Sequence, residues 1–240
     1  MKKNYLISTL FLLVFISCQN FEKKVEIKKA ENVSNDTKIG EINYERIDPK
    51  NADFRLLNDK LDKLLVNKGQ TKLILKYNKS TENIVYFIFK EKVVSQNVYE
   101  KDTISTKNLY AYIYEKNKNE LKQKIKFQDF GNELYSPIFF YDYCIIDDAN
   151  KDGIIEFYLS YYGESDGLDA KPLKVIIYTQ DNLISEFKKS KTTAFYPAGN
   201  ENDSYYLDYD SNWKNLPESI KTKSKAILNE IKNKKIIDNK

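Results

Sequence analysis

A succession of strand-like segments between Thr71 and Pro197 constrains the fold more than any other feature of the sequence. Short turns rich in Asn, Lys, Ser and Asp, such as "NKSTEN" and "KNKN", separate these segments. Alternating or continuous apolar runs bounded by such turns are typical of antiparallel hairpins. We therefore expect strands at 71–77, 82–92, 107–116, 121–130, 137–146, 153–162 and 172–180, and a last hairpin from 184–190 and 191–197.

One helix is predicted on each side of this β-rich stretch. Asp48-Pro49 is a plausible helix start and Gly69 a natural stop, and Pro217 opens a second segment near the end of the chain. In both segments the apolar residues recur at helical spacing. They are Phe54, Leu57, Leu61, Leu64 and Leu65 in the first, and Ile220, Ile227, Leu228 and Ile231 in the second. The predicted fold class is α+β, mainly an antiparallel β-sheet with one N-terminal and one C-terminal helix.

The chain begins with a segment that predicts export and lipidation. Lys2 and Lys3 precede an apolar run, and "FISC" ends it at Cys18. The run has the length of a signal sequence and is too short to span a bilayer. It resembles a bacterial lipobox; an ordinary secretory signal is the alternative. We expect a lipoprotein signal peptide at 1–17, lipidated Cys18 within a tether at 18–43, and one globular domain at 44–240.

This interpretation places the protein at the cell envelope, attached to a membrane through the lipid on Cys18. Gln19 follows the cysteine, which favours the outer membrane because an aspartate there is the familiar inner-membrane retention signal. An N-terminal strand within 19–43 is the alternative to a flexible tether. The partner at the envelope is an unidentified ligand or protein.

The composition excludes several kinds of chemistry. The chain has no histidine, which removes Ser-His-Asp and Cys-His catalysis and the imidazole ligands of zinc, copper and iron sites. Its net charge is only +4, and Arg46 and Arg55 are the only arginines, so we expect no nucleic-acid partner. Cys144 lies in an apolar run and is interpreted as a small buried side chain.

The stretch "DDANKDGIIEF" predicts a calcium loop. Calcium binds six to eight oxygen atoms, and alternate residues of a tightly turning loop can direct their oxygens to one centre. The candidate ligands are the side chains of Asp148, Asn150, Asp152 and Glu156 and the backbone carbonyl of Ile154.

This loop is not an EF-hand, although Gly153 stands where the sharp turn is needed. The bidentate acid of an EF-hand would fall at Leu159. The spacing resembles shorter Asp-x-Asp-x-Asp-Gly loops found between strands in secreted calcium-binding repeats. The alternative is a metal-free hairpin turn, because Asn-x-Asp-Gly is also good turn chemistry.

A second acidic loop contains Glu164, Asp166 and Asp169. It is either a polar loop or a binding surface for a cation or a sugar. The two acidic loops flank opposite ends of the predicted strand at 154–162, so we expect them not to share one site.

Residues 138–180 resemble a family of secreted bacterial proteins labelled surface polysaccharide biosynthesis proteins. The likeness lies in "IIDDANKDGIIEFYLSYYGESDGLDAKPLKVIIY": a strand, an Asp-rich loop ending Asp-Gly-Ile-x-Glu, a second strand, a polar loop and a strand reading Leu-Lys-x-Ile-x-Tyr. The resemblance implies a role at the envelope and defines no catalytic residue.

Three functions remain open from the sequence. The first is a lipid-anchored binding module that calcium stabilises. The second is a carbohydrate-active enzyme that uses paired carboxylates, for which Glu156 and Asp142 are candidates. The third is an immunity or inhibitor lipoprotein. Glu156 and Asp142 are candidates only, and no residue is assigned a catalytic role.

Overall fold

The computed structural model describes residues 42–47, 68–99, 102–118, 120–165, 171–180, 186–197 and 204–234. All of them lie within one compact unit, 38–240. The helix predicted from Asp48 lies outside the described residues except at its end, where Gly69 has a φ of 79°. The predicted signal peptide, Cys18 and nearly all of the predicted tether also lie outside them.

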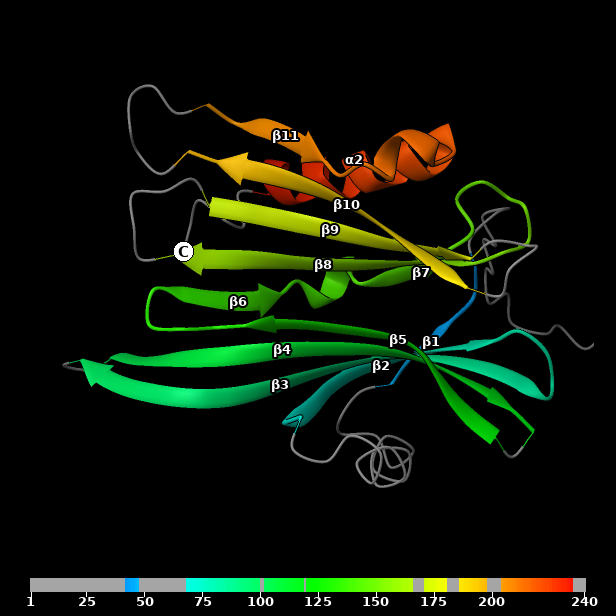
Figure 1. The fold of residues 1–240 in the computed structure, drawn as a ribbon, viewed down its shortest axis with the longest axis horizontal. Coiled ribbons are helices and arrows are strands. Elements are labelled where there is room, and N and C mark those ends of the chain that lie inside the picture. Colours follow the sequence, from blue (N-terminus) through cyan, green and yellow to red (C-terminus); the bar gives the residue numbers. More distant parts are fainter. Residues whose placement is uncertain are drawn as a thin grey trace, which may run out of the picture. The chain divides into compact units, whose positions relative to one another are not determined.

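Two antiparallel sheets make up most of the described chain (Figure 1). The first has five strands in sequential order. These are β1 (Glu45–Ile47), β2 (Gln70–Asn78), β3 (Asn83–Tyr99), β4 (Asp102–Asn117) and β5 (Glu120–Phe130). The second has the order β11-β10-β9-β8-β6, and β7 also pairs with β8. Its strands are β6 (Tyr135–Phe139), β7 (Ile145–Asp147), β8 (Glu156–Ser165), β9 (Lys171–Gln180), β10 (Phe187–Tyr196) and β11 (Tyr206–Tyr209).

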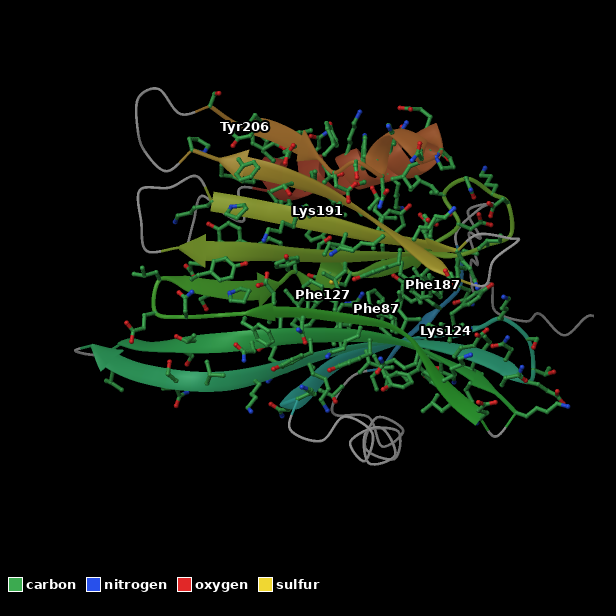
Figure 2. All side chains as sticks on the ribbon, in the orientation of Figure 1. Phe87, Lys124, Phe127, Phe187, Lys191 and Tyr206 are labelled. Carbon is green, nitrogen blue, oxygen red and sulfur yellow. The ribbon has the colours of Figure 1, made fainter. Side chains whose placement is uncertain are left out.

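The main core lies between the two sheets. Phe87 of β3 contacts Phe157 of β8 edge to face, with ring centroids 5.4 Å apart, and both side chains are fully buried. Figure 2 shows Phe87 and Phe127 in this region. Successive side chains of a strand point to opposite faces, so alternate apolar residues of β3 and β8 reach this core. The alternation recognised in the sequence therefore corresponds to real sheet faces.

The C-terminal helix covers the other face of the second sheet. Helix α2 (Glu218–Asn233) buries its apolar stripe against β8, β9 and β10, and this packing confirms the predicted C-terminal helix (Figure 1). The buried residues are the predicted Ile220, Ile227, Leu228 and Ile231, together with Ser224. Among the described ranges, no helix is both long and apolar enough to cross a membrane.

Five of the predicted strand segments differ from the structure in their bounds or connections. The segment 137–146 is interrupted by the 3-10 helix η1 (Tyr141–Tyr143), whose backbone hydrogen bonds turn the chain between β6 and β7. The segments 184–190 and 191–197 form no hairpin, because β10 runs continuously from Phe187 and pairs with β9 and β11. Strands β3 and β4 extend well past the predicted segments, pairing as far as Tyr99 and Asp102.

Candidate metal centre

The acidic loop joins β7 to β8 in a hairpin whose last paired residues are Asp147 and Glu156. Two loop residues adopt left-handed backbone, Lys151 with a φ of 59° and Gly153 with a φ of 83°. Only glycine adopts this conformation without strain. A Cβ added to Gly153 would meet no atom within 4 Å, so its role is conformational. The left-handed backbone at Lys151 and Gly153 turns the loop back toward its own start.

Backbone amides of the loop converge on the carboxylate of Asp148. Its two oxygens accept hydrogen bonds from the N–H groups of Asp152 and Gly153, each at 3.0 Å. The Asp152 carboxylate in turn accepts the N–H of Ile154 at 2.8 Å. Asn150 donates its side-chain amide to Asp152 at 2.7 Å and accepts the Asp152 N–H at 3.2 Å. The loop is therefore ordered by its own side chains, which turn inward.

The turned loop brings three carboxylates together. One oxygen from each of Asp148, Asp152 and Glu156 lies within 4.8 Å of the others. Oxygens bound to the same calcium ion at 2.3–2.6 Å lie at most about 5 Å apart, so this cluster could hold a metal ion. The structure thus unites three of the five predicted ligands. Asn150 contacts Asp152, and the contact found for Ile154 involves its N–H group.

Glu156 is the least exposed member of the cluster. Only 3% of its surface is accessible, and its Oε2 accepts the Ala149 N–H at 2.8 Å. Burial, together with the negative charges of Asp148, Asp152 and Asp147, raises the pKa of Glu156 to about 7, against the opposing Ala149 hydrogen bond. Like charges held together in a buried position disfavour the ionised form, and a bound cation would reverse this effect.

Two groups beside the cluster were not singled out by the sequence. Asp147 pairs with Lys223 of α2 at 2.7 Å, so the helix supplies a positive charge at the base of the loop. The buried hydroxyl of Tyr158 has no hydrogen-bond partner among the described residues. Burial raises the Tyr158 pKa, and the charges of Glu156 and Asp147 add to the rise. No local pattern marks Lys223 or Tyr158, because their proximity depends on the packing of α2 and β8.

Two members of the cluster, Asp152 and Glu156, line a groove of about 880 Å³. Residues of β10, of the 3-10 helix η2 (Trp213–Asn215) and of the start of α2 also line it. Carboxylates, amides, a hydroxyl, lysines and an apolar edge line it. The lining residues on which the argument depends are Asn150, Asp152, Glu156, Thr179, Lys188 and Asn215.

The second acidic loop does not join this centre within the part of the chain that the structure describes. Glu164 lies near the far end of β8 from Glu156 and pairs with Ser136. Asp166 and Asp169 lie outside the described residues. Asp142 is exposed in η1 and is not among the groove residues described above. Cys144 is buried and free, as predicted, and burial raises its thiol pKa to about 12.

Comparisons with known proteins identify no relative: no family model matches the chain, and no curated protein or solved structure matches it. The site must therefore be interpreted from its own geometry.

Proposed function

We propose that the protein is a calcium-dependent binding module of the cell envelope, anchored through a lipid on Cys18. The observation that carries the proposal is the clustering of the Asp148, Asp152 and Glu156 carboxylates within 4.8 Å, where Asp152 and Glu156 also line a groove of about 880 Å³. A cation in this position would both hold the loop together and present a charge to a ligand in the groove.

The donor set favours calcium over other metals. The candidate ligands are oxygens only: the three carboxylates, the Asn150 amide and the Ile154 carbonyl. Oxygen ligands select hard cations, and the chain has no histidine that would favour a transition metal. Magnesium needs nearly ideal octahedral geometry at 2.0–2.1 Å, whereas calcium accepts irregular sets of six to eight oxygens. A single short loop that leaves some coordination positions open fits calcium better.

The location at the envelope rests on the N-terminal sequence. The signal-like segment and Cys18 support export and lipidation, and the outer membrane is the proposed destination. Metabolic labelling with a radioactive fatty acid would test the anchor: label should appear in the wild-type protein and vanish in Cys18→Ala. Label retained in that variant would overturn the anchor and leave the metal site untouched.

Thermal unfolding of the full-length protein in EDTA and in 5 mM calcium tests the metal site. A ligand that binds only the native state adds RT ln(1 + [L]/Kd), about 2 kcal/mol at that concentration for a Kd near 0.1 mM. We expect calcium to raise the Tm of the wild type. Asp152→Asn keeps the acceptor for the Ile154 N–H but removes a charged ligand, so it should lose most of the rise.

The matched control is Asp142→Asn, which neutralises an exposed carboxylate away from the loop. It should respond to calcium as the wild type does. Equal Tm values in EDTA and calcium for the wild type would overturn the proposed function, and so would an unaltered response in Asp152→Asn.

A further inference from the structure

Lys188 also lines the groove beside the acidic loop, and the strand register shows how it lies relative to Glu156. Phe157 pairs with Tyr178, so the next residues along, Glu156 and Thr179, are neighbours across β8 and β9. Thr179 pairs with Lys188 of β10. Paired residues share a sheet face, and adjacent strands lie about 4.8 Å apart. Glu156 and Lys188 therefore face the same groove from backbones about 10 Å apart.

The start of α2 also borders the groove. Pro217 and Ile220 line the groove, and Pro217, as the N-cap residue, supplies no side-chain acceptor for the first-turn amides. The unpaired N–H groups at a helix start carry partial positive charge and favour anions. Lys188 and the start of α2 thus line the same groove as Asp152 and Glu156.

The wall that contains η2 is held firmly against β10. Asn212 donates its side-chain amide to the Lys189 carbonyl at 2.9 Å. The Asp210 carboxylate accepts both the Ser190 hydroxyl at 2.9 Å and the Trp213 N–H at 3.1 Å. A ligand would therefore meet a preformed wall, and little ordering of the protein would oppose binding.

The uncharged side chains that line the groove indicate which other groups a ligand should carry. Thr179, Gln180 and Asn215 offer hydroxyl and amide groups that suit a ligand with many hydroxyls. Leu216 and Ile220 provide a small apolar edge. Among the described residues that line the groove, none is aromatic, so recognition by ring stacking has no basis there. Charge and hydrogen bonding must supply the affinity.

We infer that the groove binds an acidic saccharide whose carboxylate bridges the cation at the acidic loop and Lys188. The inference rests on the proposed function, because the bridge needs the cation. The open coordination positions of the ion take carboxylate and hydroxyl oxygens, and the ammonium group of Lys188, two strands from Glu156, adds a charge-assisted contact to the ligand carboxylate. The polar side chains accept and donate to the sugar hydroxyls.

Calorimetric titration of the full-length protein with galacturonate trisaccharide tests this inference. We expect binding in 5 mM calcium and none in EDTA. The methyl-esterified trisaccharide keeps the sugar framework but lacks the charge, so it should bind at least tenfold more weakly, as expected for loss of a charge-assisted contact of about 1.4 kcal/mol or more. Equal binding of the ester would overturn the inference.

Variants in β10 locate the contact. Lys188→Gln should weaken binding of the trisaccharide about tenfold, the factor expected for one charge-assisted contact. Lys191→Gln is the matched control, because Lys191 is three residues further along β10 and points to the opposite face. It should bind as the wild type does. Equal losses in both variants, or none in Lys188→Gln, would contradict the bridge.

The two proposals fail in different ways. A calcium-dependent rise in Tm without binding of the trisaccharide overturns the inferred ligand and leaves the calcium site standing. The absence of any calcium response removes the proposed function and the cation bridge with it. Binding of inorganic phosphate as strong as that of the trisaccharide would show that the groove binds anions without recognising a sugar. That result would also overturn the inferred ligand.

Discussion

Replacement of Glu156 by glutamine should stabilise the metal-free protein at alkaline pH. Glutamine is neutral and isosteric, and its amide oxygen can keep the hydrogen bond from the Ala149 N–H. What the substitution removes is the negative charge, which burial and three neighbouring carboxylates disfavour. In EDTA at pH 8 we therefore expect Glu156→Gln to unfold at a higher urea concentration than the wild type.

The magnitude follows from the pKa of Glu156, which rises from an ordinary value of 4.5 to about 7. Each pKa unit corresponds to about 1.4 kcal/mol, which gives an upper bound of about 3 kcal/mol. The groove admits water that screens these charges, so we expect about 1–2 kcal/mol.

The sign of the pH dependence is set by the raised pKa in the folded state. The folded wild type holds its proton more tightly than the unfolded chain, so the stability that this proton provides is complete below pH 4.5. It is lost as the pH rises through about 7. The wild type and Glu156→Gln should therefore have similar stability at pH 4 and diverge by pH 8.

Urea unfolding at pH 4, 6 and 8, with and without 5 mM calcium, measures the effect. Calcium should reverse the order at pH 8, because the wild type gains binding energy and Glu156→Gln has lost a charged ligand. A Glu156→Gln variant that is less stable than the wild type by the same amount at every pH in EDTA would refute the reasoning, since it would show that the charge carries no cost in the fold.

The remaining predictions concern the loop, the helix contact and the buried thiol. Gly153→Ala should lower the free energy of unfolding by about 1–2 kcal/mol through left-handed backbone strain alone. Gly163→Ala should lower it more, because the added Cβ would lie 2.4 Å from an aromatic ring carbon. Urea unfolding ranks the two variants, and a larger loss in Gly153→Ala would contradict the close packing at Gly163. Lys223→Gln removes the ion pair with Asp147 and should lower the free energy of unfolding by about 1 kcal/mol, and by less in high salt. Unchanged stability of this variant in low salt would contradict a stabilising ion pair. Cys144 should resist a thiol reagent in the native state and react on unfolding, because it is buried and its pKa is raised to about 12; rapid native labelling would contradict its burial.

Local patterns determined several strands of both sheets and the C-terminal helix. The apolar stripe of the helix after Pro217 predicted which side chains are buried, because a helical period depends only on the chain itself. Alternation likewise located β2, β8 and β9. The Asp-rich loop was also predictable, since Asp148 and Asp152 order it through bonds to nearby amides.

Only the tertiary structure decided where strands continue and which loop residues become a site. The residues around Lys191 contain no signal that separates a turn from a continuous strand; pairing of β10 with both β9 and β11 decides it. Glu156 is buried because it lies at the start of β8 on the face that the helix covers. Lys188 lines the same groove because the register of β8, β9 and β10 places it on that face. Composition and spacing report what a residue can bind, whereas burial and long-range pairing determine what it meets, because those depend on segments distant in the chain.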